Sequence, residues 1–234
     1  MKYVIVKNIP RGSDDLEISA KLASFGVATV AESQEKQNVM DSEIRPIQLG
    51  RSITGTAVTV RTSDADNLMI HAAIEYCQKG DVLVVSTLSE TRNGYFGELM
   101  ATACKKRGVT GLIIDGGVRD TKQLRDIGFP VWSRYVNVTG TSKSKPGWVN
   151  VPISAGNVNV NPGDFVVADD DGVVVVRRES VREVLSNANA REDKEKLTRQ
   201  KIAQGELSMD FYSLRKVIQD LHIEILERED VKSG

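Results

Sequence analysis

The sequence predicts an α/β protein: a layered α/β sandwich with a central sheet, β-hairpins and a helical C-terminal extension. Segments of strand length that are rich in β-branched residues alternate with segments of helix length up to Tyr135. This order is typical of a largely parallel sheet covered by helices. From Val149 the pattern changes to short β-runs separated by turns. The 234 residues, 40% of them hydrophobic, are enough for one large domain with a buried core.

The first part of the chain is expected to form helices and strands in turn. A helix is expected over residues 14–25, because Ser13 is a favourable N-cap and Gly26 a common helix end. Apolar, β-branched runs predict strands over residues 54–61, 81–86, 111–115 and 129–135, and helical periodicity predicts helices over residues 66–78, 97–107 and 121–127. The run at 81–86 is almost continuously apolar, which suits a sheet covered on both faces.

The last third of the chain is expected to be a β-hairpin followed by helices. The turn Asp169-Asp170-Asp171-Gly172 would join strands over residues 165–168 and 173–176. A long helix over residues 180–204 is too strongly charged to bury against its own core, and residues 209–221 form a last amphipathic helix. These patterns predict an α/β sandwich domain over residues 1–178 and a helical extension over residues 179–234, which either frays or packs on a neighbouring subunit.

Composition excludes several classes of partner. The 31 lysine and arginine residues nearly balance the 32 aspartate and glutamate residues, so the formal net charge is −1 and no nucleic-acid partner is expected. No apolar run approaches the roughly 20 residues of a membrane span, and residues 1–6 do not form a signal peptide. Cys77 and Cys104 are each expected in a helix as small buried hydrophobic residues. We therefore expect a cytoplasmic protein without a membrane partner.

Several catalytic signatures are missing from the sequence. It contains no Gly-x-x-x-x-Gly-Lys-Ser/Thr phosphate loop, no Gly-x-Gly-x-x-Gly after a strand and no Cys-x-x-Cys pair. With two histidines, His71 and His222, neither a His-rich metal site nor a Ser-His-Asp triad can be identified. A metal would therefore need mainly oxygen ligands, which favours Mg²⁺ or Mn²⁺ over zinc.

The most informative residues lie in two stretches, 94–100 and 114–120. The first contains a glycine-flanked helix start, whose backbone N–H groups can bind an anionic group such as a substrate carboxylate. The second follows a buried strand, at a position where open α/β sheets bind ligands. There Arg119 offers a bidentate clamp for a carboxylate and Asp120 a hard metal ligand. A turn with a surface ion pair is the alternative interpretation.

The spacing of these residues resembles a known signature. Glu98, twenty intervening residues and then Arg119-Asp120 resemble the Asp-x20-Arg-Asp signature of class II pyruvate aldolases, with glutamate in place of the first aspartate. The stretches at 94–102, 113–120, 129–133 and 167–173 resemble the 4-hydroxy-4-methyl-2-oxoglutarate / 4-carboxy-4-hydroxy-2-oxoadipate aldolases. These aldolases share a superfamily with the regulators of ribonuclease activity A. The resemblance covers about residues 26–212.

The resemblance implies a role for each matching residue. Arg119 would hold the keto oxygen or a carboxylate of the substrate, and Asp120 would bind Mg²⁺ or Mn²⁺ with water filling much of the coordination shell. The glutamate side chain at position 98 would orient or deprotonate a water that relays a proton. The pyruvyl carboxylate would be bound by the backbone amides of the segment Gly97, Glu98, Leu99 and Met100.

The resemblance also implies an assembly and a reaction. Family members use a glutamate from the C-terminal helix of a neighbouring subunit, for which Glu195 fits best and Glu192 second. They assemble as trimers, often paired into hexamers, so a homo-oligomer is expected. The implied reaction is cleavage of a 4-hydroxy-2-oxo acid to pyruvate and a second oxo acid, with oxaloacetate decarboxylation as a side activity. A non-catalytic regulator and an enzyme acting on another 2-oxo acid without an aldol step are the alternatives.

Two features outside the signature permit more than one interpretation. Asn67 and His71 lie four residues apart on an expected helix, so both side chains can face one cleft and bind a distal carboxylate of the substrate. A lone helical histidine is also commonly a structural or surface residue. The three aspartates at 169–171 suggest a metal site, but the turn chemistry of a hairpin tip explains them better.

Overall fold

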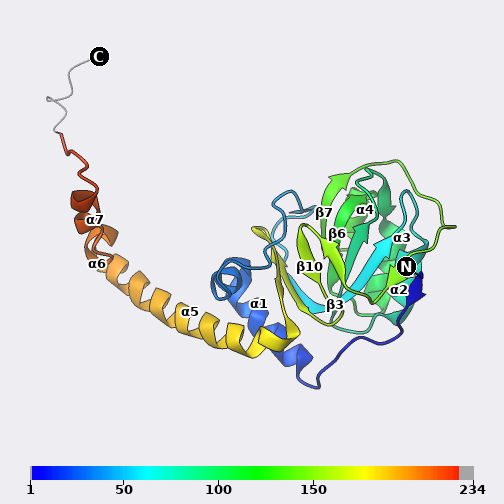
Figure 1. Ribbon diagram of the computed structural model, residues 1–234, viewed down its shortest axis with the longest axis horizontal. Helices are drawn as coiled ribbons and strands as arrows, with labels where there is room; N and C mark the ends of the chain where they lie inside the picture. Colours follow the sequence, from blue (N-terminus) through cyan, green and yellow to red (C-terminus); the bar gives the residue numbers. More distant parts are fainter. Residues whose placement is uncertain (1, 227–234) are drawn as a thin grey trace, which may run out of the picture. The chain divides into compact units, whose positions relative to one another are not determined.

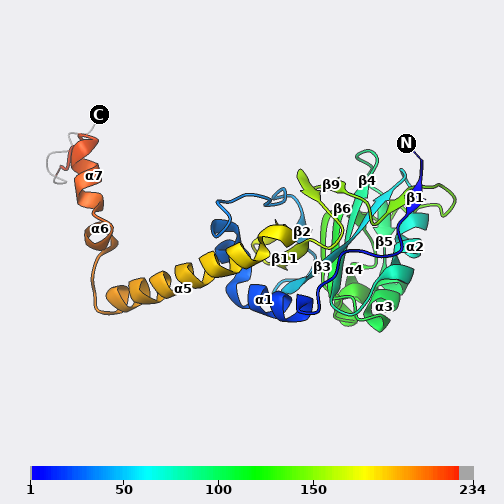
Figure 2. The same ribbon diagram turned by 60° about the horizontal axis from the view of Figure 1, so that its bottom comes forward.

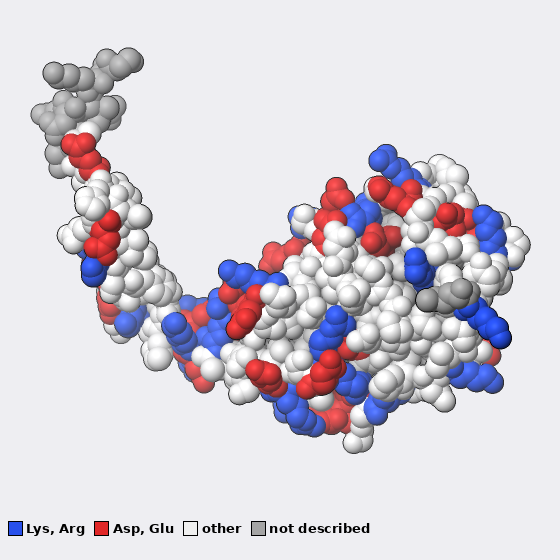
Figure 3. Space-filling model, in the orientation of Figure 1, with Lys and Arg blue, Asp and Glu red and all other residues white. Residues whose placement is uncertain are grey.

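The computed structural model describes residues 2–226, and the chain divides into two compact units, Met1–Asn189 and Ala190–Gly234. Figure 1 traces the chain through both units by colour. Among the described residues, no helix is long and apolar enough to cross a membrane. On the face of the first unit in view in Figure 3, acidic and basic side chains are intermixed and no basic patch stands out.

A central parallel sheet forms the middle layer of the first unit, as expected from the sequence. Its four main strands lie side by side in the order β3 (Ile53–Thr62), β4 (Asp81–Thr87), β6 (Gly111–Val118) and β7 (Val131–Val136). The apolar runs in β4 and β6 are fully buried, because both faces of this sheet are covered. Parallel strands place their C-terminal ends at one edge, and that edge carries the candidate site.

Short strands extend this sheet. The hairpin of β11 (Phe165–Asp169) and β12 (Gly172–Val176) pairs antiparallel with the first half of β3, which confirms the expected hairpin. The second half of β3 pairs with β8 (Trp148–Val149), and β1 (Val4–Ile5) follows at the edge. At the other edge β2 (Arg45–Pro46) pairs with β7, while β5 (Gly94–Phe96) runs parallel to the end of β6. A separate hairpin consists of β9 (Ile153–Ala155) and β10 (Val158–Val160).

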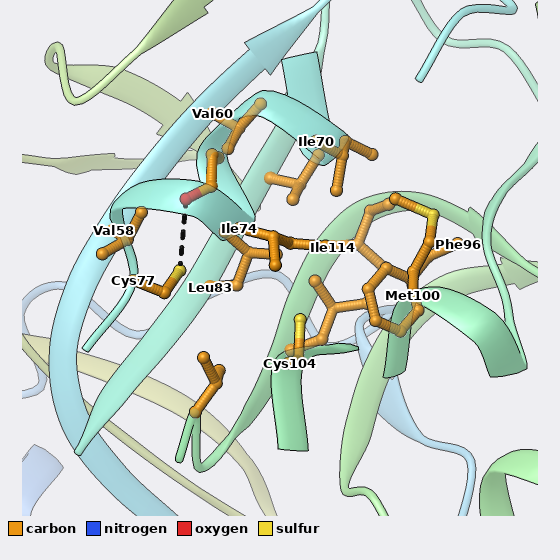
Figure 4. Close-up of a cluster of buried hydrophobic side chains, with 14 of the residues drawn as sticks. Val58, Val60, Ile70, Ile74, Cys77, Leu83, Phe96, Met100, Cys104 and Ile114 are labelled. Atoms are coloured by element: carbon orange, nitrogen blue, oxygen red, sulfur yellow. Dashed lines mark hydrogen bonds between the residues drawn. The ribbon is translucent and has the colours of Figure 1, made fainter. Parts of the chain in front are cut away.

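Helices cover one face of the sheet and the β9–β10 hairpin covers the other (Figures 1 and 2). The helices are α2 (Leu68–Tyr76), α3 (Glu98–Lys106) and α4 (Thr121–Asp126). Figure 4 shows side chains of α2 and α3 packed against the strands, with Cys77 and Cys104 among the buried residues. The Cys77 thiol donates to the carbonyl oxygen of Ala73 at 3.4 Å, and burial raises the pKa of Cys104 to about 12. Both cysteines are buried and free, as small hydrophobic residues would be.

Helix α1 (Asp15–Glu32) is longer than the sequence predicted. The expected end at Gly26 is present as a kink, because Gly26 has φ of 76° and ψ of 166°, but the chain then re-enters a helix. Val27 donates its backbone N–H to the carboxylate of Asp169 at 2.9 Å, so a residue distant in sequence caps the restarted helix. The N-cap is Asp14, and the expected Ser13 cap is wrong.

The first of the C-terminal helices begins inside the first unit. Helix α5 (Val181–Ala203) follows a short 3₁₀ turn (Arg178–Ser180), and its residues Val181 and Val184 join a buried cluster with α1 and the β11–β12 hairpin. The sequence placed the boundary after residue 178, whereas the first compact unit extends to Asn189 because these valines are buried.

The expected single helix over residues 209–221 is wrong. The chain forms α6 (Ser208–Phe211) and α7 (Leu214–Asp220), separated at Ser213, whose φ of 57° is left-handed and cannot continue an α-helix. Apolar side chains of this second unit are exposed, and they include Leu207, Tyr212, Val217 and Leu221. Packing of this extension on a neighbouring subunit stays a prediction.

Candidate active site

A pocket of about 100 Å³ lies where the end of β6 meets the starts of α2 and α3. Residues of both sequence stretches line it, together with Asn67, His71 and a loop lysine. The complete lining is Asn67, His71, Gly94, Tyr95, Gly97, Leu99, Met100, Arg119, Asp120 and Lys143. The structure thus brings together residues that lie up to 76 positions apart in the chain. The pocket lies at the C-terminal edge of the parallel strands, where ligands bind in open α/β sheets.

Arg119 and Asp120 follow directly after β6. The backbone N–H of Arg119 donates to the carbonyl oxygen of Phe96 at 2.9 Å, which ties this position to β5. Asp120 has a left-handed backbone with φ of 57°, and its side chain does not cap α4. Instead its Oδ2 accepts the backbone N–H of Glu98 at 3.2 Å and lies 3.7 Å from Nε of Arg119. Both side chains remain about half exposed, so a ligand can reach them.

Two glycines make room for this pair. A Cβ on Gly97 would lie 2.3 Å from Oδ2 of Asp120, and a Cβ on Gly140 would lie 2.9 Å from Nη1 of Arg119. Neither glycine has a positive φ, so a side chain at either position would displace Asp120 or Arg119 and would not strain the backbone.

The start of α3 offers two backbone donors. Glu98 gives its N–H to Asp120, and the first helical bond runs from Ala101 to the carbonyl oxygen of Gly97 at 3.1 Å. The N–H groups of Leu99 and Met100 have no acceptor within residues 2–226. Of the four amides that the sequence suggested, these two are therefore available for an anionic group of a ligand.

The side chain of Glu98 points along its own helix. Its Oε1 accepts the hydroxyl of Thr102 at 2.8 Å, one turn further on, and Glu98 is not among the residues that line the pocket. The role of this carboxylate in handling a water therefore stays a prediction. What the structure places at the site is the backbone N–H of Glu98, which orients Asp120.

Asn67 and His71 both lie in the pocket wall. Asn67 is 7% exposed and donates its side-chain N–H to the carbonyl oxygen of Tyr95 at 2.8 Å. Its Oδ1 is buried and has no partner among the described residues, so it can accept a hydrogen bond from a ligand. Burial, and then the positive charge of Lys143, lower the pKa of His71, so its imidazole is neutral at pH 7.

Sequence reasoning missed Lys143, which lines the pocket from a loop. Lys143 lies in a polar Ser-Lys-Ser-Lys stretch that contains no recognised motif, 23 residues after Asp120. Nothing in this local pattern distinguishes it from a solvated surface lysine. Only the tertiary structure, which places this loop beside α2, shows that Lys143 lines the pocket.

The metal-binding groups that line the pocket suit a hard cation that is held weakly. Asp120 is the one carboxylate that lines the pocket in the described chain, and its Oδ1 accepts no hydrogen bond from residues 2–226. The described residues contain no group of three His, Cys, Asp or Glu side chains that could hold a metal. Mg²⁺ is often held by one or two carboxylates, with water and substrate as its other ligands, so Asp120 fits Mg²⁺ or Mn²⁺ and not zinc.

Glu195 and Glu192 belong to the second unit. Glu195 pairs with Arg191 at 3.0 Å and with Arg199 at 2.9 Å along α5, while Glu192 is exposed. Their expected role at the site of a neighbouring subunit stays a prediction.

A larger hollow of about 350 Å³ is lined by Asp115 and Arg134, not by the signature residues. The guanidinium of Arg134 binds Asp115 through Nε at 2.5 Å and Asp41 through Nη1 at 3.0 Å. Burial would lower the pKa of Arg134, but these carboxylates raise it, so the group stays charged. This ion-pair network ties β6 and β7 to the loop before β2, and among the described residues it contains no group that could hold a metal.

The fold and site define an α/β sandwich protein with an Arg–Asp pair at the end of a central parallel strand. The family model described as "RraA-like: Aldolase/RraA" matches residues 27–175. The chain belongs to the RraA-like family.

Two similar proteins carry an aldolase name, and one similar solved structure belongs to a family of RNase inhibitors. A protein of Halalkalibacterium halodurans named "Putative 4-hydroxy-4-methyl-2-oxoglutarate aldolase" is 26% identical over 204 residues, which cover 87% of this chain and 97% of the relative. A protein of Burkholderia multivorans with the same name is 30% identical, covering 58% of this chain and 83% of the relative. The crystal structure of Streptomyces coelicolor RraAS2, described as an unusual member of the RNase ES inhibitor RraA family, has a TM-score of 0.73 and 31% identity, covering 81% of this chain and 99% of that one.

Proposed function

We propose that this protein is a class II pyruvate aldolase, a carbon–carbon lyase that depends on Mg²⁺ or Mn²⁺. Its substrates would be 4-hydroxy-2-oxo acids with two or three carboxylates, such as 4-hydroxy-4-methyl-2-oxoglutarate or 4-carboxy-4-hydroxy-2-oxoadipate, and oxaloacetate decarboxylation would be a side activity. The observation that supports it most is the placement of Arg119 and Asp120 beside two free backbone amides in one pocket. The names of the relatives from Halalkalibacterium halodurans and Burkholderia multivorans agree with it.

In this proposal the pyruvyl end of the substrate lies at the start of α3. The carboxylate accepts hydrogen bonds from the amides of Leu99 and Met100, and Arg119 faces the C2 oxygen. Asp120 would hold the cation, which when bound would supply Lewis-acid chemistry at this oxygen. Arg119 stabilises the negative charge that develops there, and such a donor contributes most in the transition state.

The distal end of the substrate would lie against α2. Lys143 provides a positive charge for the distal carboxylate, and the neutral His71 can donate one hydrogen bond. Oδ1 of Asn67 accepts only, so it suits the C4 hydroxyl group and not a carboxylate. In the reaction the C4 hydroxyl would give its proton to a water that Glu98 orients or deprotonates, and the C3–C4 bond breaks. The electron pair of that bond forms the pyruvate enolate, and the same water relays a proton back to C3.

The direct test is pyruvate release from each substrate and from oxaloacetate, measured with a coupled lactate dehydrogenase assay. Activity should disappear in EDTA and return when Mg²⁺ or Mn²⁺ is added. Full turnover in excess chelator would contradict the metal requirement. Trapping of the enzyme by borohydride in the presence of substrate would show Schiff-base chemistry instead.

A non-catalytic regulator is the second candidate, because RraAS2, at 31% identity, is described as belonging to a family of RNase inhibitors. The two candidates differ in their use of the pocket. If the protein acts by binding a ribonuclease, an Arg119→Ala/Asp120→Ala variant should retain that binding in a pull-down and inhibition assay. Retained inhibition, together with no pyruvate release by the wild type, would favour the regulator.

A further inference from the structure

Asp66 is a fully buried carboxylate at the start of α2, next to the pocket residue Asn67. Its Oδ1 accepts the backbone N–H of Leu68 at 2.9 Å, which satisfies one of the free donors at the helix start. Its Oδ2 accepts three further donors, and all come from one loop: the hydroxyl of Ser142 at 2.6 Å, the N–H of Ser144 at 2.7 Å and the N–H of Lys145 at 3.0 Å. One oxygen therefore serves the helix and the other serves the loop.

We call residues 137–147 the strap, because this loop is fastened at two places beside the pocket. At its first end the N–H of Asn137 donates to Val118 at 2.9 Å and the side chain of Asn93 donates to Gly140 at 3.0 Å. At its second end Asp66 holds the three donors, and the backbone of Asn67 donates to Ser142 at 3.0 Å. Between these attachments the strap is largely exposed to solvent.

The strap carries two contributions to the pocket. Gly140 lies against the guanidinium of Arg119, and Lys143 lines the pocket itself. Lys143 lies between Ser142 and Ser144, both of which donate to Asp66, so the carboxylate holds this lysine in place through its two chain neighbours. Capping α2 would need only one carboxylate oxygen, and the second oxygen is used entirely to hold the strap.

The charge of Asp66 is balanced by hydrogen bonds. Lys145 directs its ammonium group to the carbonyl oxygen of Asp64 at 2.8 Å, and no ion pair to Asp66 occurs among the described residues. Burial would raise the pKa of Asp66, but hydrogen bonds from Ser142, Ser144, Leu68 and Lys145 lower it. The ionised carboxylate therefore depends on the strap donors, and the strap depends on the carboxylate.

We propose that Asp66 is a positioning residue of the substrate pocket: it fastens the strap so that Lys143 stands in the pocket wall, and substrate affinity depends on it although it does not touch the substrate. The proposal rests on the proposed function for its effect on affinity. The fastening of the strap is independent of that function.

The test compares Asp66→Asn with Asp164→Asn. An amide has one acceptor oxygen, so it can serve the helix or the strap and not both. Asp164 is an equally buried carboxylate in a turn outside the pocket, where it accepts the N–H groups of Asn161 and Arg178 and the guanidinium of Arg177. Asp66→Asn should raise KM about 10-fold or more and change kcat less, as expected for lost ground-state binding. Asp164→Asn should lower thermal stability but leave KM unchanged.

A double variant shows whether Asp66 acts through Lys143. Lys143→Met should raise KM by itself, and adding Asp66→Asn should raise it little further. Equal KM changes in Asp66→Asn and Asp164→Asn, or additive effects of Asp66→Asn and Lys143→Met on KM, would overturn the positioning role.

A second variant serves if Asp66→Asn does not fold. Ser142→Ala removes one strap donor and should also raise KM. An unchanged KM in Ser142→Ala would count against the proposal.

Hydrogen exchange separates this inference from the proposed function. In Asp66→Asn the amides of Ser144 and Lys145 should exchange faster, while those of Asn161 and Arg178 should not. If the wild type releases no pyruvate, the proposed function fails. The exchange result alone then shows whether Asp66 fastens the strap. Unchanged exchange at Ser144 and Lys145 would overturn the fastening whatever the activity.

Discussion

Gly97 and Asp120 approach so closely that a methyl group on Gly97 would lie 2.3 Å from Oδ2 of the aspartate. Gly97 has an extended backbone, with φ of −149° and ψ of −168°, which alanine can adopt without strain. The clash would therefore fall on the side chain of Asp120 and not on the fold.

Gly97→Ala should lower kcat/KM about 10²-fold, because a displacement of about 1 Å at the chemistry costs that much. The Tm of the variant should stay within a few degrees of the wild type. Gly116→Ala is a matched control, since a Cβ there would lie 3.4 Å from its nearest neighbours. A fully active Gly97→Ala variant would show that the position of Asp120 is not critical.

Arg119→Lys keeps the positive charge but removes the planar guanidinium. We expect kcat to fall about 10²-fold or more, as for the loss of an oxyanion donor. Arg125→Lys, an exposed change on α4, should have no effect on pyruvate release. Near-normal kcat in Arg119→Lys would place Arg119 away from the developing charge.

The pKa of His71 should be below its usual value of 6.5, because burial and then Lys143 both disfavour the charged imidazole. Lys143→Met should raise this pKa, and Lys145→Met, two residues along the same strap, should leave it unchanged. The two histidine signals can be followed by NMR titration, with His222→Gln to assign them. If the pKa of His71 does not rise in Lys143→Met, the charge of Lys143 does not act on His71.

The same shift predicts a pH dependence of stability. Because the folded pKa of His71 is lower than the unfolded one, the unfolded state binds more protons between the two values. The contribution of neutral His71 is therefore present above about pH 6.5 and is lost as the pH falls through the folded pKa. Urea unfolding can measure the free energy of unfolding of the wild type and of His71→Gln across this pH range. The difference between the two proteins should become smaller as the pH falls. A difference that does not change with pH would contradict this prediction.

Glu195 is predicted to complete the site of a neighbouring subunit. Glu195→Ala and Asp120→Ala should each be inactive but still assembled, since Glu195 makes only pairs along its own helix in the described chain. Mixing the two variants should restore part of the activity, because some interfaces would then hold one intact site. Mass spectrometry must show that subunits exchange. If they exchange and no activity is recovered, Glu195 does not contribute to a shared site and is only a surface residue of α5.

Local patterns were sufficient for most elements of the first unit. The strands β3, β4, β6 and β7 were predicted in order. Alternation and β-branched residues predicted β3, and apolar runs predicted β4 and β6, because strands buried on both faces are largely apolar. The spacing from Glu98 to Arg119 and Asp120 also identified the edge of the sheet at which the pocket lies. Two helix predictions were wrong for nonlocal or conformational reasons: Asp169 restarts α1 beyond Gly26, and Ser213 interrupts the last helix.

The sequence by itself determined the fold class, the family resemblance and the Arg–Asp pair, because hydrophobic periodicity and motif spacing are properties of short segments. Only the tertiary structure decided which groups line the pocket. It turned the side chain of Glu98 along α3, left two helix amides free, and brought Lys143 beside His71. The physical reason is that a buried carboxylate such as Asp66 needs hydrogen-bond donors wherever the fold supplies them. Leu68 supplies one donor locally, and the other three lie 76 to 79 positions further along the chain.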